Sequence, residues 1–105
     1  MRIISRRRLR EFWSIPGHAD ATEPLRQWYA KVKGAFWKTP ADVKRTFGAS
    51  VDFVKVASGN TVDVFDVAGN KYRLIAAVHY DYGRVFVLRI MTHREYDLNR
   101  WKHEL

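Results

Sequence analysis

In the first half of the chain, apolar residues recur at the three- and four-residue spacing of a helix. Leu9, Phe12 and Trp13 form one such stripe, which predicts a helix that stops before the following Pro-Gly pair. Ser5 is expected to cap its start. A longer stripe follows a second capping pattern at Asp20 and predicts an amphipathic helix. Its apolar members are Leu25, Trp28, Tyr29, Val32 and Phe36.

From Val51 onward the apolar period changes to two, which is typical of strands. Just before that point, Thr39 as cap and Pro40 in the first turn predict one more short helix, which ends at Gly48. Turn sequences rich in Gly and Asn then divide the second half. The strands expected are residues 2–4, 51–56, 61–67, 71–80 and 85–91.

The order of these elements predicts one domain, residues 1–105, with an α+β fold. An N-terminal strand and two to three helices would pack on a small, mostly antiparallel sheet, with a C-terminal helix at the end. We expect the helices on one face. The run Leu74–Val78 is nevertheless apolar on both sides, which is typical of a central strand between two layers.

Basic residues outnumber acidic ones by 19 to 11, and the net charge is +8. Residues 1–50 carry 11 basic and 4 acidic side chains, whereas residues 51–105 carry 8 and 7. The helical half is therefore the basic half. This imbalance favours a nucleic acid as partner over the alternative of a merely soluble surface.

Three absences narrow the class of protein. The chain has no cysteine, which excludes disulfides and thiolate catalysis and fits a reducing compartment. The start of the chain lacks the apolar segment of a signal peptide, and no run has membrane-spanning length. We therefore expect a cytoplasmic protein with no membrane partner.

Residues 92–97, Thr-His-Arg-Glu-Tyr-Asp, follow directly on the last strand. The first and fourth of them form a capping box, which places His93 in the first turn of a terminal helix. The positive end of the helix dipole disfavours an imidazolium there, which leaves a ring that can be neutral, and hence basic, near physiological pH.

Helical spacing would bring His93, Tyr96, Asp97 and Arg100 to one face of that terminal helix. An imidazole, a phenol, a carboxylate and a guanidinium are the groups needed to cleave RNA without a metal. They supply a base for the 2′-OH, an acid for the leaving oxygen and a cation for the phosphate. The alternative is a solvated polar face with no chemistry.

Arg73 is a cation near the start of an otherwise apolar strand. A buried, unpaired charge costs several kcal/mol, so its guanidinium must reach water, a carboxylate or a ligand. Two interpretations stay open, a salt bridge to Asp63 or Asp66 and a contact with phosphate. Lys55 and Arg89 are also cations on predicted strands, and the same two interpretations apply to them, with weaker support.

Metal and cofactor sites find no support. The four histidines are scattered without zinc-ligand spacing, and no phosphate-binding glycine loop is present. We expect neither a metal nor a cofactor.

Two segments carry a resemblance to a known family. The motifs G-N-x-Y-R-L at residues 69–74 and T-H-x-E-Y-D at residues 92–97 resemble those of HigB-type toxins of bacterial type II toxin–antitoxin systems. The similarity extends over nearly the whole chain.

This resemblance implies a RelE-like fold and an mRNA interferase that cuts mRNA on the ribosome, with a helix-turn-helix antitoxin of the HigA type as partner. It implies Arg73 and His93 as the main catalytic residues, followed by Tyr96, Asp97 and, more weakly, Lys55. The basic side chains expected to contact RNA are Arg6, Arg7, Arg8, Arg10, Lys31, Lys33, Arg89 and Arg100. A non-catalytic RNA- or ribosome-binding module and a toxin with a protein target remain alternatives.

Overall fold

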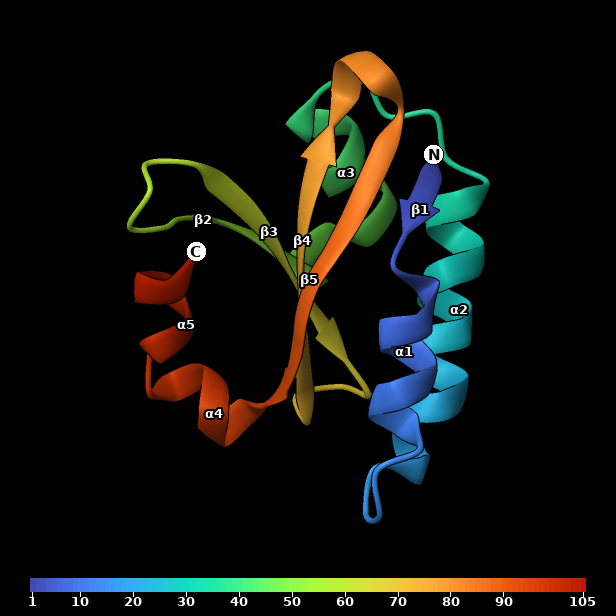
Figure 1. Cartoon of the computed structure of the whole chain (residues 1–105). Coiled ribbons are helices and arrows are strands. Elements are labelled where there is room, and N and C mark those ends of the chain that lie inside the picture. Colours follow the sequence, from blue (N-terminus) through green and yellow to red (C-terminus); the bar gives the residue numbers. More distant parts are fainter.

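A five-stranded sheet forms the centre of the computed structural model, which describes residues 1–105 (Figure 1). Its spatial order is β1-β5-β4-β3-β2. Only β1 runs parallel to its neighbour, and the other three pairings are antiparallel, as the sequence predicts. The strands are β1 (Arg2–Ile4), β2 (Val51–Lys55), β3 (Thr61–Val67), β4 (Tyr72–His79) and β5 (Arg84–Thr92).

Helices cover both faces of the sheet, so the expectation of a single helical face is wrong. Figure 1 shows α1 and α2 on one side of β4 and β5 and the C-terminal helices on the other. The helices are α1 (Arg6–Trp13), α2 (Thr22–Lys33), α3 (Pro40–Phe47), α4 (His93–Asp97) and α5 (Arg100–Glu104), joined in part by the 3-10 turns η1 (Ala19–Ala21), η2 (Gly48–Ser50) and η3 (Tyr80–Tyr82). No helix has the length and apolar character needed to cross a membrane.

Two apolar clusters explain the two layers. The larger one joins 16 buried residues of α1, η1, α2, the loop before α3, α3 and the sheet. At its centre Phe65 is fully buried, with ring centroids 5.5 Å from Trp28 and 4.8 Å from Phe47. The smaller cluster lies on the opposite face, where Trp101 of α5 covers the strand residues Val62, Val64, Ile75 and Met91 and, just after β2, Val56. This second apolar surface is what requires a helix on that side.

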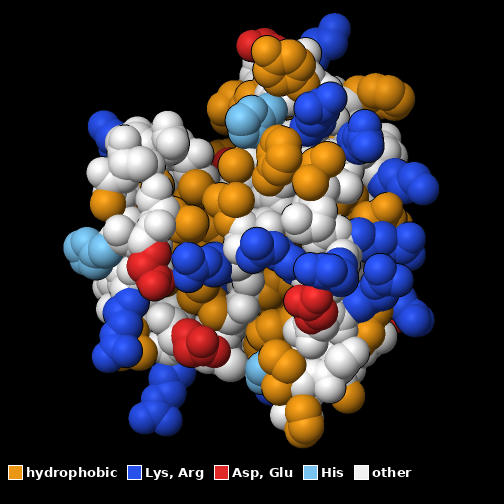
Figure 2. All heavy atoms as spheres, viewed as in Figure 1, with side chains coloured by type: hydrophobic (Ala, Val, Ile, Leu, Met, Phe, Trp, Pro, Cys, Tyr) orange, Lys and Arg blue, Asp and Glu red, His pale blue; other side chains and the backbone are white.

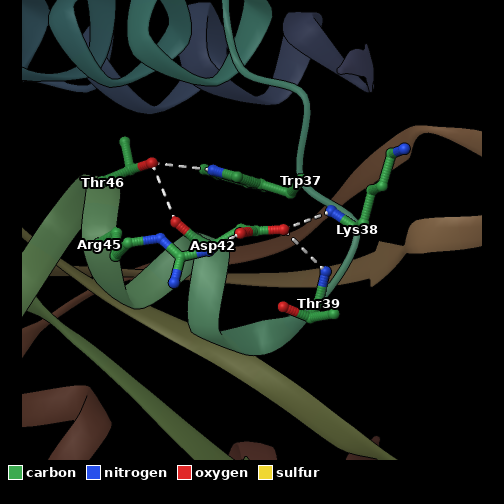
Figure 3. Close-up of polar contacts among 6 residues, drawn as sticks. All are labelled: Trp37, Lys38, Thr39, Asp42, Arg45 and Thr46. Atoms are coloured by element: carbon green, nitrogen blue, oxygen red, sulfur yellow. Dashed lines mark hydrogen bonds and ion pairs between the residues drawn. The ribbon is translucent and has the colours of Figure 1, made fainter.

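Helix α3 begins with a local hydrogen-bond network (Figure 3). The Asp42 carboxylate accepts from the backbone N–H of Lys38 at 2.8 Å and of Thr39 at 3.1 Å. The Trp37 indole donates to Thr46 Oγ1 at 2.9 Å one turn further on. These bonds hold the loop after α2 against α3 and confirm the predicted start at Thr39–Pro40.

Three local expectations are wrong. Ser5 precedes α1 in a left-handed conformation, φ 76°, and its side chain makes no capping bond, because a capping serine needs extended backbone. Asp20 lies in η1 and does not cap α2, since its carboxylate binds Lys71 and the Tyr72 hydroxyl instead. Helix α2 ends at Lys33, so Phe36 lies outside its stripe and is 90% exposed.

Asp63 is an acidic residue on β3, and the residues on either side of it along the strand, Val62 and Val64, are buried. It is 4% exposed, and its Oδ2 has no hydrogen-bond partner. Burial raises the pKa of Asp63 from 3.8 to about 7. Below that pH the folded chain therefore favours the protonated, neutral acid.

Alanine substitution of Phe65 and of Phe36 should have very different effects on the free energy of unfolding, because Phe65 is buried and Phe36 is exposed. Phe65→Ala is expected to lower the free energy of unfolding by about 3–5 kcal/mol, because it empties the centre of the larger cluster. Phe36→Ala, the matched control, should change it by less than about 0.5 kcal/mol. Urea denaturation of both variants measures the difference, and equal losses would contradict the core described here.

The pKa of Asp63 predicts a pH dependence of stability. The folded chain keeps a proton that the unfolded chain releases above pH 3.8, so this residue makes the free energy of unfolding fall as the pH rises from 3.8 to about 7. Asp63→Asn removes that contribution. Denaturation across this pH window should show the variant gaining on the parent chain as the pH rises, and parallel curves would contradict a buried neutral acid.

Candidate active site

The end of β5 lies beside the start of β4, which places α4 next to the base of the central strand. Thr92 pairs with Tyr72 across the sheet, and the His93 N–H donates to the Lys71 carbonyl at 3.0 Å. The capping box is formed, because Thr92 Oγ1 accepts from the Glu95 N–H and Glu95 Oε1 accepts from the Thr92 N–H, each at 3.2 Å. His93 therefore occupies the first turn of α4, as the sequence predicts.

Arg73 sits close to this helix start and is only 7% exposed. Its Nε lies 3.1 Å from Asp66 Oδ1 on β3, directly across the strand pair. One terminal nitrogen donates to the Tyr72 carbonyl at 3.0 Å, and the other donates to Asn70 Oδ1. Of the two interpretations of this residue, the salt bridge is what the structure contains.

Asp66 and not Asp63 is the partner of Arg73, because the two acids lie an odd number of residues apart on β3 and so face opposite sides of the sheet. Asn70 was not anticipated as a partner. It lies three residues before Arg73 in the turn between β3 and β4, where Ala68 and Gly69 have φ values of 54° and 67°. This left-handed turn carries Asn70 back toward the strand.

Tyr96 connects Arg73 to the C-terminal helices. The guanidinium carbon of Arg73 lies 5.5 Å from the centre of the Tyr96 ring, a cation–π distance. The ring stacks on Trp101 at 5.2 Å, and the Trp101 indole donates to the Tyr96 carbonyl at 3.1 Å. Burial, more than the nearby charges, raises the pKa of the Tyr96 phenol. The phenol is therefore a hydrogen-bond donor at neutral pH.

His93 is the accessible member of the group, with 43% of its side chain exposed. Its Nε2 lies 3.5 Å from Asp97 Oδ2, one turn along α4, and that carboxylate is 62% exposed. Its Nδ1 is buried and has no partner. An imidazole with a nearby carboxylate is suited to accept and return a proton.

Arg100 and Lys55 do not join this group. The terminal helix breaks at Asn99, whose φ is 61°, so Arg100 begins α5 and does not continue the face of His93. Lys55 lies on the same side of β2 as Val51, which belongs to the larger cluster on the opposite face of the sheet from Arg73.

Basic side chains gather along the open edge of β5. Strand β1 pairs only with residues 84–86, so the carbonyls beyond them have no strand partner there. Arg8 of α1 donates to the Leu88 carbonyl at 2.7 Å, and Arg89 pairs with Glu104 of α5 at 3.0 Å. Figure 2 shows Lys and Arg side chains as a band across the middle of this face. Arg8 and Arg89 line one hollow of about 350 Å³ between α1 and β5.

The remaining basic residues of the expected RNA-binding set are spread over α1 and α2. Arg7 pairs with Glu11 at 2.9 Å, whereas Arg6 and Arg10 line a hollow between the two helices. Lys31 lies 5.6 Å from the centre of the Phe47 ring, and Lys33 lies 6.0 Å from that of Tyr29. Of the expected set, only Arg8 and Arg89 line the hollow at the β5 edge.

Comparison with known protein families supports the resemblance carried by the motifs at residues 69–74 and 92–97. Residues 21–99 match the model of the HigB toxin family, described as the RelE-like toxic component of a toxin–antitoxin system. The chain belongs to the HigB toxin family. The matched range contains Arg73 and all of α4, but not the arginines of α1.

Three curated HigB proteins are similar over most of their length. The mRNA interferase toxin HigB of Escherichia coli strain K12 is 30% identical over 98 residues, which cover 92% of this chain and 88% of that protein. The mRNA interferases HigB of Escherichia coli O157:H7 and of Shigella flexneri match with the same identity and coverage. As the toxic component of a toxin–antitoxin system, a HigB-family protein has an antitoxin as its partner.

The Arg73 pair should contribute to stability. Asp66→Asn is expected to lower the free energy of unfolding by about 1–3 kcal/mol, because it leaves a buried guanidinium without its counter-charge. Asp97→Asn, an exposed acid beside His93, is the matched control and should change it by less than about 0.5 kcal/mol. Chemical denaturation compares the two, and equal effects would argue that Arg73 does not need Asp66.

Proposed function

We propose that this HigB-family protein is an mRNA interferase, an endoribonuclease that cleaves mRNA being translated on the ribosome. One observation carries the proposal. A buried arginine lies against the ring of Tyr96, which belongs to the same helix as the accessible His93. The names of the similar HigB proteins support the same activity.

The proposed reaction is transfer of the phosphate to the neighbouring 2′ oxygen. The 2′-OH of one nucleotide attacks the adjacent phosphorus, the bond to the 5′ oxygen of the next nucleotide breaks, and the products are a 2′,3′-cyclic phosphate and a 5′-OH. His93 either takes the 2′-OH proton while water protonates the leaving 5′ oxygen, or protonates that oxygen while water takes the 2′-OH proton. Asp97 orients the imidazole, and the Tyr96 phenol donates to a phosphate oxygen.

Arg73 would stabilise the charge of the pentavalent phosphorus. A guanidinium has five N–H groups. Three of them are engaged by Asp66, the Tyr72 carbonyl and Asn70, which leaves two for a phosphate oxygen. Because these bonds hold the guanidinium before RNA arrives, little reorganisation is needed in the transition state.

The basic side chains would hold the RNA and the ribosome. Among them, Arg8 and Arg89 line one hollow at the β5 edge and are the proposed first contacts with RNA. Contacts of this kind depend on phosphate and weaken with salt. Lys55 and Arg100 would act as outer contacts, because neither lies beside Arg73.

No metal or cofactor enters the proposed chemistry, since the 2′-OH supplies the nucleophile. The proposed partner that neutralises the toxin is a helix-turn-helix antitoxin of the HigA type. The proposed location is the cytoplasm, where translated mRNA is found.

A second function, RNA or ribosome binding without cleavage, is favoured by one observation. Asp66 already neutralises Arg73, and the guanidinium is nearly covered. A guanidinium with a counter-ion of its own stabilises the added charge of a transition state less strongly, whereas RNA binding requires only the exposed cations elsewhere on the surface. Detection of cut RNA ends separates the two functions.

His93→Ala should abolish most cleavage while the protein stays folded. Loss of an acid or base slows such reactions by about 10²–10⁴-fold. Arg73→Lys, which keeps the charge but loses the planar fork, should also slow cleavage strongly. The rate of appearance of new mRNA 5′ ends in a purified translation reaction, read by primer extension, measures both effects. Lys38→Ala, which changes an exposed lysine in the loop before α3, is the matched control and should cut at a rate within about threefold of the parent chain.

Full cleavage by both His93→Ala and Arg73→Lys would overturn the assignment of this site. Intact mRNA with growth arrest would favour the binding function or a protein target instead. Toxin pretreated with EDTA and added to a reaction with its magnesium restored should cut at the parent rate.

A further inference from the structure

A hollow of about 250 Å³ lies between α1 and α2, on the opposite face of the sheet from Arg73. Helical spacing creates it, because residues three and four apart on each helix turn toward the other helix. Its lining consists of three arginines, two aromatic rings and one leucine: Arg6, Leu9, Arg10, Trp13, Arg26 and Tyr29. The proposed cleavage chemistry uses neither ring and does not use Arg26.

Two of the arginines are held across the gap between the helices. The Arg6 guanidinium lies 4.8 Å from the centre of the Tyr29 ring, and that of Arg26 lies 5.5 Å from the Trp13 ring. Each helix therefore supplies a guanidinium to an aromatic ring of the other. A guanidinium over a ring keeps the N–H groups at its edge free for an anion.

None of the three arginines in the hollow has an acidic partner. The arginines of the described ion pairs are Arg7, Arg45, Arg73 and Arg89. Arg6, Arg10 and Arg26 instead bring three positive charges into one concave site, and the neutral rings compensate none of them. A lined depression of one charge sign concentrates the potential and attracts the opposite charge.

We infer that this pocket binds a phosphomonoester, the terminal phosphate of a nucleotide or of an RNA 5′ end. Guanidinium forks match the oxygen geometry of phosphate. A monoester carries a charge of about −1.5 to −2 near pH 7, which suits three arginines better than the single charge of a carboxylate or of a backbone diester. The volume is just below the range of about 300–1,000 Å³ typical of small-molecule pockets, which favours an end group over a continuous strand.

The test is a titration of the full chain observed by NMR, with the Trp13 indole N–H as reporter in the pocket and Trp101 as reporter on the other face. 5′-AMP and inorganic phosphate should shift the Trp13 signal in a saturable way, adenosine should not, and the Trp101 signal should stay in place. Arg26→Gln should weaken 5′-AMP binding about tenfold or more.

Arg84→Gln is the matched control. Arg84 also lies over an aromatic ring, at 5.9 Å from the centre of Tyr82, and has no acidic partner, but it is outside the pocket. Its substitution should leave the affinity for 5′-AMP unchanged. Equal weakening in both variants would reduce the effect to net charge and overturn the inference.

Further probes identify the ligand class. A 2′-O-methyl oligonucleotide that binds more tightly with a 5′-phosphate than with a 5′-OH, and more tightly than 5′-AMP, supports the pocket and assigns it to RNA ends. Preference for 5′-AMP supports it and assigns it to free nucleotides. Binding of adenosine equal to that of 5′-AMP, or of a glutamate-rich peptide in preference to every phosphate, overturns it. None of these probes can be cleaved at a 2′-OH diester, so the result is independent of whether the protein cuts mRNA.

Discussion

Burial of β4 on both faces is the constraint on which the rest of the structure depends. Tyr72, Leu74 and Ala76 point into the larger cluster, and Ile75 points into the smaller one. Where a strand is buried on both faces, water does not solvate a charged side chain, so other residues of the protein must be its partners. The antiparallel register does so for Arg73, since it aligns Asp66 on β3. The same sheet pairs Tyr72 with Thr92, and this is why α4 begins beside that guanidinium.

Patterns within a few residues of one another were predictable from the sequence. The capping box at Thr92 and Glu95 is three residues long, and the proline start of α3 is equally local, so both could be found without knowledge of the fold. The change of apolar period at Val51 likewise marked the start of β2, from which the four antiparallel strands follow. Local chemistry dominates at these points, and tertiary contacts reinforce it.

Features set by tertiary pairing were harder to anticipate. The choice between Asp63 and Asp66 as partner of Arg73 depends on strand register, which the apolar pattern left open. The second helical layer depends mainly on one large residue, Trp101, in a five-residue helix too short to show a stripe. The break at Asn99 is a backbone property of a single residue, and it divided a face that uniform helical spacing would have kept whole.

The attachment of the last helices has a consequence for motion in this fold. Besides the turn at its start, the segment of α4 and α5 is held by the packing of Trp101, the pair of Glu104 with Arg89, and a backbone bond from Ala57 to the Lys102 carbonyl. Such a segment is a small cooperative unit whose detachment requires far less free energy than global unfolding. Amide exchange should therefore be faster there than in β3. When it detaches, the guanidinium beneath Tyr96 becomes open to solvent while the 16-residue cluster on the other face stays intact.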